Sequence, residues 1–198
     1  MLRVMIYAMA FTTGFAIMAV EMLGGRILAP WFGGSIYIWG SIITIFLVAL
    51  SLGYLVGGSL STHSPNLRKY GVLFFLSGIS LFPVILFSDA LMDLTYLITE
   101  DPRYGSLLAA ALLFFIPAFI MGMISPYSIR LLVTSQQASG HTAGRLYFVS
   151  TLGSALGTVG TAFYFVLSFE VNQILTTTVL CLVIPGLLCQ LSSWSPDE

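Results

Sequence analysis

Residues 38–60 read IWGSIITIFLVALSLGYLVGGSL and contain no charged side chain. A helix that crosses the hydrocarbon core of a bilayer needs about 20 mostly apolar residues, so this stretch predicts a membrane span. The rest of the chain is similar, because 58% of its 198 residues are hydrophobic and 8% are charged. The sequence therefore predicts an all-α, polytopic membrane helical bundle. We expect a single transmembrane domain over residues 1–198 with six helices, near 4–25, 37–60, 70–90, 106–133, 144–168 and 171–191.

The polar connections between these stretches predict the orientation. Five of the seven basic residues fall on one side if the N-terminus is inside: Arg3, Arg68, Lys69, Arg130 and Arg145. Lys and Arg are enriched in cytoplasmic loops, so we expect both termini to be cytoplasmic and the protein to lie in the cell (inner) membrane. On the outer side, LMDLTYLI within residues 91–105 predicts a short interfacial helix.

Two charged residues stand near the end of the first predicted helix. Gly14, Glu21 and Gly25 recur at helical spacing, so Glu21 shares a face with two glycines that allow a neighbouring backbone to come close. A charge at the centre of a membrane helix costs about 2.5–3.5 kcal/mol, so we expect Glu21 to point into the bundle. If the helix breaks at Gly24–Gly25, Arg26 can reach the Glu21 carboxylate. The pair is then either a cation or proton site gated by Arg26, or a clamp that holds the loop over residues 26–36.

Small residues predict close helix packing in the second helix. Ala49, Gly53 and Gly57 recur every four residues and form a face on which another helix can approach closely. The partner helix lies either in the same chain, which is favoured, or in a second copy.

The fifth helix combines glycines with hydroxyl groups. Residues 143–165 read AGRLYFVSTLGSALGTVGTAFYF. We expect Gly153 and Gly157 to pack against another helix. The hydroxyl residues either line a polar cavity or bond to carbonyls of their own helix, and both interpretations stay open; these residues are Tyr147, Thr151, Ser154, Thr158 and Thr161.

Several functional classes lack support in the sequence. A net charge of −1 provides no basic face for nucleic acid. His63 and His141 have no Cys, Asp or Glu at ligand spacing, and Cys181 and Cys189 form no CxxC motif. Neither a phosphate-binding loop nor a nucleophile–base set is present. We therefore expect no catalytic residues, no metal and no cofactor.

Helices 1–3 and 4–6 are weakly similar to each other. The first helix carries Glu21 and then Arg26, and the fourth carries Ser125–Pro126 and then Arg130. The second and fifth helices are both rich in glycine. Three helices followed by three related ones must have inverted topology, which is the construction of one half of a major-facilitator transporter. The sequence therefore predicts a 3+3 inverted repeat.

Two stretches carry a family resemblance: EMLGGRILAPWFGGSIYIWGSIITIFLVALSLGYLVGG at 21–58 and GRLYFVSTLGSALGT at 144–158. They resemble the membrane part of fused major-facilitator/spermidine-synthase-like proteins in motif, order and spacing, and they cover well under half of the chain. The positions that match the family motif are Glu21, Arg26, Tyr147, Ser150 and Ser154. The resemblance implies a membrane domain of six to seven helices that is often joined to an aminopropyltransferase-like domain. We expect no such domain after the last helix, and hence no polyamine synthesis by this chain.

Two functions follow from these features. The first is binding or transport of a small solute, with a cation favoured by the carboxylate of Glu21, and with Arg26, Tyr147, Thr151 and Ser154 as the other candidate residues. The alternative is a non-catalytic membrane subunit that anchors or regulates a partner protein or a synthase-like enzyme. In both cases we expect the lipid bilayer as surroundings, and either a homo-oligomer or a membrane or soluble partner subunit. An intramembrane enzyme ranks last.

Overall fold

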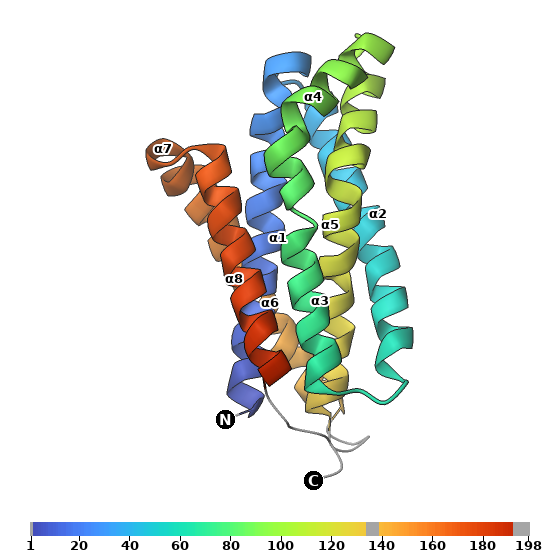
Figure 1. Ribbon diagram of the computed structural model, residues 1–198, viewed down its shortest axis with the longest axis vertical. Helices are drawn as coiled ribbons and strands as arrows, with labels where there is room; N and C mark the ends of the chain where they lie inside the picture. Colours follow the sequence, from blue (N-terminus) through green and yellow to red (C-terminus); the bar gives the residue numbers. More distant parts are fainter. Residues whose placement is uncertain (1, 134–138, 192–198) are drawn as a thin grey trace.

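The computed structural model describes residues 2–133 and 139–191, and every regular element in these ranges is helical. Within them, six helical segments are long and apolar enough to cross a membrane. The predicted all-α bundle with six crossings is therefore confirmed. α1 begins and α8 ends at the same end of the bundle (Figure 1).

Nine helical elements build these six segments in the described ranges. They are α1 (Leu2–Phe32), α2 (Ile36–Ser61), α3 (Leu67–Ile79), α4 (Phe82–Ile98), α5 (Pro102–Leu132), α6 (Ser139–Gly160), the π-helix η1 (Thr161–Phe165), α7 (Val166–Ser168) and α8 (Val171–Leu191). α3 with α4 forms the third crossing, and α6 with η1 and α7 forms the fifth. α6 begins earlier than the predicted residue 144, and residues 134–138 of the predicted connection lie outside the described ranges.

The first helix is longer than predicted. α1 continues through Gly24–Gly25 and Pro30 and ends at Phe32, so residues 26–32, which were expected in a loop, are helical. The helix ends where Gly33 takes a φ of 82° and its amide donates to the carbonyl of Ala29 at 2.9 Å. Glycine adopts this left-handed conformation without a Cβ clash, which makes it the usual residue just after a helix end. The predicted end of the first helix at residue 25 is therefore wrong, and α1 does not break at Gly24–Gly25.

The third crossing is interrupted where the sequence suggested a continuous helix. α3 ends at Ile79 and α4 begins at Phe82, one residue before Pro83. Proline has no amide to donate to the preceding turn, so the helix is interrupted just before it. Residues 91–98 continue α4, and Met92 and Thr95 are fully buried. The separate interfacial helix predicted within residues 91–105 is therefore wrong.

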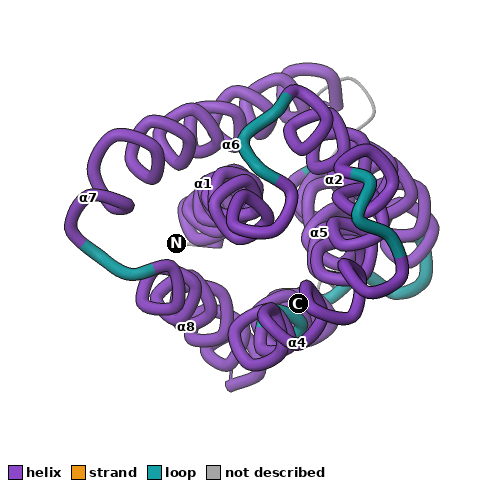
Figure 2. The backbone as a smooth tube through the Cα atoms, turned by 90° about the horizontal axis from the view of Figure 1, so that it is seen from above, coloured by secondary structure: helices purple, strands orange, loops and turns teal. Residues whose placement is uncertain are grey.

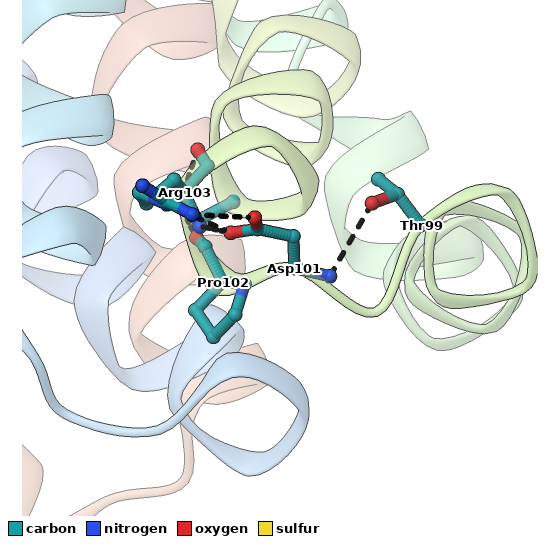
Figure 3. Close-up of polar contacts among 5 residues, drawn as sticks. Thr99, Asp101, Pro102 and Arg103 are labelled. Carbon is teal, nitrogen blue, oxygen red and sulfur yellow. Dashed lines mark hydrogen bonds and ion pairs between the residues drawn. The ribbon is translucent and has the colours of Figure 1, made fainter.

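Asp101 caps the start of α5, which begins at Pro102, four residues before the predicted beginning at residue 106. Its carboxylate accepts from the backbone amide of Arg103 at 2.9 Å and forms an ion pair with the Arg103 guanidinium at 3.0 Å (Figure 3). The amide of Asp101 donates to the hydroxyl of Thr99 at 3.3 Å. The hydrogen bonds from Arg103 hold the pKa of Asp101 below its usual value. An aspartate cap followed by Pro102 is a favourable helix start.

The spanning segments pack mainly in three pairs, which are α1 with α6, α2 with α5, and α3 with α8. α1 lies inside a ring formed by the other helices (Figure 2). It contacts α5, α2 and α8 in addition to α6. This arrangement places the face of α1 that carries Gly14 and Glu21 among other helices.

Candidate functional site

Glycines let two of the helix pairs approach backbone to backbone. Gly53 and Gly57 of α2 lie against backbone atoms of Phe119 and Met123 in α5. A Cβ at Gly57 would lie 2.5 Å from the Cα of Met123, closer than real Cβ contacts. The partner of the small face in α2 is thus a helix of the same chain.

The second pair, α1 with α6, has the same construction. Gly153 and Gly157 of α6 lie against backbone atoms of Phe11 and Phe15 in α1. A Cβ at Gly157 would lie 2.9 Å from the Cα of Phe15. The four glycines predicted to pack therefore all lie at contacts between helices, two in each pair.

A reciprocal glycine extends the likeness between the two pairs. Gly122 of α5 faces the carbonyl of Leu50 in α2, three residues before Gly53. Gly14 of α1 faces the carbonyl of Ser150 in α6, three residues before Gly153. Each pair thus contains glycines on both helices, in the same relative positions.

A cavity of about 180 Å³ lies where these two pairs meet, and we name it the four-helix cavity. Its walls come from α1, α2, α5 and α6. Tyr54 of α2 and Tyr147 of α6, which are 47% and 55% exposed, are the most accessible of its large side chains. α2 and α6 do not pack closely against each other, so the cavity opens between them. The lining residues include Gly14, Met18, Tyr54, Ser125, Tyr147, Ser150, Thr151 and Ser154.

Some hydroxyl residues of the fifth crossing bond to backbone carbonyls, whereas others line the cavity without a partner. Ser154 donates to the carbonyls of Gly14 at 3.1 Å and Ser150 at 3.2 Å, and Thr158 donates to that of Ser154 at 3.0 Å. These bonds stay within α6 or join it to α1. Tyr147 and Thr151 line the cavity together with Ser154, but their hydroxyls have no partner among the described residues. Thr161 is buried with an unsatisfied hydroxyl and lies outside the cavity lining.

Glu21 lies one helical turn beyond Met18, on the face of α1 that lines the four-helix cavity. The residue is only 9% exposed. Within the described part of the chain it makes no hydrogen bond and no ion pair. A buried ionisable group with no partner is costly in a membrane and is a functional-site hypothesis by default.

Arg26 does not pair with Glu21, so the predicted clamp between them is wrong. In a continuous helix five residues turn the chain by about 140°, which places the two side chains on different sides of α1. The Nη1 of Arg26 donates instead to the carbonyl of Val166 in α7 at 3.3 Å. Arg26 is exposed and is not part of the cavity lining.

Sequence reasoning missed Tyr54 and Ser125, which line the same cavity from α2 and α5. Neither belongs to a hydroxyl stripe, and only the packing of four helices brings them together with Thr151. Ser150 and Ser154 were named among the family-like positions, and both line the cavity. No group of three or more His, Cys, Asp or Glu side chains in residues 2–133 and 139–191 is placed to hold a metal ion.

No family model, curated protein or solved structure matches the chain. The resemblance to the spermidine-synthase-like membrane domains therefore stays an expectation.

Proposed function

We propose that this integral membrane protein binds a small solute in the four-helix cavity and moves it across the membrane, with Glu21 as the group that selects a cation. The observation that carries the proposal is the state of Glu21. The residue is 9% exposed, its carboxylate has no protein partner in the described ranges, and it lies one turn from a cavity with free hydroxyl groups. A positively charged solute or a proton supplies the missing partner.

The walls of the cavity support recognition of a small polar molecule. Tyr147, Thr151 and Tyr54 offer hydroxyl groups that bond to no described protein group. The volume of about 180 Å³ is below the range of about 300–1,000 Å³ that is usual for drug-sized ligands. A small organic cation, whose ammonium group is drawn by Glu21 and whose polar atoms meet these hydroxyls, is the solute class that we propose.

The two glycine-packed pairs also support the 3+3 inverted repeat, which remains part of this proposal. When the first three crossings are exchanged with the last three, α2 takes the place of α6 and α5 takes the place of α1. The packed pair of α2 and α5 then coincides with the packed pair of α6 and α1. Many transporters are built in this way, with the solute site at the interface of the repeats near the middle of the membrane. Both stretches that resemble the spermidine-synthase-like family contribute to the cavity walls, so membership of that family is compatible with this function.

The orientation with both termini in the cytoplasm is likewise a proposal. The end at which α1 begins carries Arg3, Arg68, Lys69, Arg130 and Arg145, whereas Arg26 and Arg103 lie toward the other end. This distribution matches the excess of Lys and Arg in cytoplasmic connections.

Uptake into proteoliposomes tests the function. The probes are radiolabelled putrescine and spermidine, with neutral glycerol and anionic succinate as comparison solutes. We expect uptake of at least one cation above empty liposomes, and its loss in Glu21→Gln and reduction in Thr151→Val. Glu100→Gln is the matched control, because Glu100 is an exposed acid between α4 and α5. Unchanged uptake by Glu21→Gln removes Glu21 from the mechanism, and uptake equal to empty liposomes for every solute contradicts transport.

The alternative role, a membrane subunit for a partner protein, has one observation in its favour. The spanning segment of α6, η1 and α7 has the smallest share of buried residues among the described segments, about 17% of its most apolar stretch compared with 33–50% for the others. Mass spectrometry after purification in mild detergent tests this role. A monomer with no co-purifying protein contradicts it.

A further inference from the structure

A second hollow lies on the opposite side of α1 from the four-helix cavity. It has a volume of about 360 Å³, and we name it the Phe groove after the rings of Phe11, Phe15, Phe165 and Phe169 in its walls. α1 forms its floor, and its sides are formed by Phe165 of η1 with Phe169 in the turn after α7 and by helix α8. The ring view in Figure 2 shows α6–α7 and α8 apart from each other on this side of α1. The groove is therefore a long, mostly apolar space between helices.

The π-helix η1 forms one wall of the groove. Its last residue, Phe165, packs against Phe15 of α1 with ring centroids 6.2 Å apart. A π-helix is wider than an α-helix and is found frequently at functional sites. Phe169 follows in the turn after α7 and lines the groove as well.

A free positive charge lies beside the same segment. Arg26 donates through Nη1 to the carbonyl of Val166, which lies between Phe165 and Phe169 in the chain. The Arg26 side chain is exposed, and no carboxylate of the described residues lies within 4.0 Å of it. A guanidinium has five N–H donors, so most of the donors of Arg26 are free for an anion. Arginine is well suited to phosphate because its donors match two oxygens at once.

We propose that the Phe groove holds one acyl chain of an anionic phospholipid whose phosphate binds Arg26. The apolar walls match a hydrocarbon chain, and the unpaired guanidinium matches a negative headgroup. The surrounding bilayer supplies this amphiphile to a groove between two spanning segments. Glu170 lies in the turn between α7 and α8 and opposes the phosphate. Its charge limits the affinity of the site.

Native mass spectrometry of the purified full chain tests the proposal. The probes are dioleoylphosphatidylglycerol and dioleoylphosphatidylcholine, which have the same acyl chains and differ in headgroup charge. One Arg near a membrane surface contributes about 1 kcal/mol toward an anionic lipid, or roughly a fivefold preference. We expect this preference for phosphatidylglycerol in the wild type, its loss in Arg26→Gln and an increase in Glu170→Gln. Arg103→Gln is the control, because Arg103 is already paired with Asp101.

A second pair of variants tests the groove itself. Thr177 and Thr176 are adjacent and exposed, and each donates to a carbonyl of the preceding turn of α8, but only Thr177 lines the groove. We expect Thr177→Trp to fill the groove and lower retention of both lipids several-fold, while Thr176→Trp leaves retention unchanged. Thermal unfolding identifies any variant that fails to fold, and the Arg26→Gln result then decides. Equal retention of the two lipids by the wild type, an unchanged preference in Arg26→Gln, or equal retention by the two Trp variants overturns the proposal.

Discussion

Replacement of Gly57 by alanine should loosen the contact between α2 and α5, while the same change at Gly58 should not. A Cβ at Gly57 would lie 2.5 Å from the Cα and 2.8 Å from the carbonyl carbon of Met123. These are rigid backbone atoms, so the two helices must separate. A Cβ at Gly58 meets nothing within 4 Å. Because the two glycines are neighbours in one helix, Gly58→Ala is a matched control.

The magnitude follows from two opposing effects. Alanine in place of glycine inside a helix stabilises it by up to about 1 kcal/mol, and both variants share this gain. Overpacking at a close contact typically costs about 1–3 kcal/mol, and only Gly57→Ala has this cost. The free energies of unfolding of the two variants should therefore differ by about 1–3 kcal/mol. For a chain of this size, that corresponds to roughly 2–4 °C in Tm for each kcal/mol.

Thermal unfolding followed by circular dichroism in one detergent measures this difference. The equivalent pair in the second half is Gly157→Ala with Gly144→Ala as its control, since a Cβ at Gly144 also meets nothing within 4 Å. We expect Gly157→Ala to lose stability by a similar amount. If Gly57→Ala and Gly157→Ala are as stable as their controls, the close backbone approach does not hold the two pairs together.

Three further predictions concern the ends of the bundle. Asp101→Asn should reduce the acid-side loss of Tm, because a carboxylate whose pKa is lowered on folding stabilises the protein above its ordinary pKa near 4 and loses that effect as pH falls; identical pH profiles for wild type and variant would contradict this. Trp31→Phe removes the donor to Asp93, a bond of 3.1 Å, and should cost about 1 kcal/mol in urea unfolding. In intact cells, a membrane-impermeant maleimide should label Gly34→Cys but not His63→Cys; the reverse pattern would show that the termini are outside.

The number of crossings could be predicted from the sequence, and so could the bounds of α2 and α8 to within one residue, but the ends of α1, α4 and α5 could not. Apolar length alone predicts six spans, because the bilayer requires backbone groups to be satisfied within each helix. The loop expected over residues 26–36 rested on Pro30, Gly33 and Gly34, and a contact between Arg26 and Glu21 required a break at Gly24–Gly25. In the structure Gly24 and Gly25 make room for aromatic rings. A Cβ at Gly24 would lie 3.2 Å from the ring of Phe114, and a Cβ at Gly25 would lie 2.9 Å from the ring of Trp39. They are small because aromatic rings pack on them.

The residues of the candidate site were also predictable only in part. Spacing within one helix places Tyr147, Thr151 and Ser154 on one face, because residues three and four apart share a face, and all three line the four-helix cavity. Tyr54 and Ser125 come from other helices, and no spacing within the chain relates them to α6. The Phe groove was missed for this reason too, as its four rings come from both ends of the sequence.

The register of the proposed 3+3 repeat distinguishes residues that have a counterpart in the other half of the chain from residues that have none. Glycine contacts are the better marker of register, because rigid backbones fix them, whereas a long arginine side chain can reach the interface from different depths. These contacts make Gly14 of α1 the counterpart of Gly122 of α5. With the same difference in residue number, Ile17 is the counterpart of Ser125, and both of these line the cavity. An alignment of the two halves that matches Arg26 with Arg130 is shifted by one helical turn from the alignment given by the glycines. In the glycine register Glu21 corresponds to Ile129, so the carboxylate has no counterpart in the second half. A group needed only for packing would be expected in both halves, and its presence in one half alone favours a role in binding.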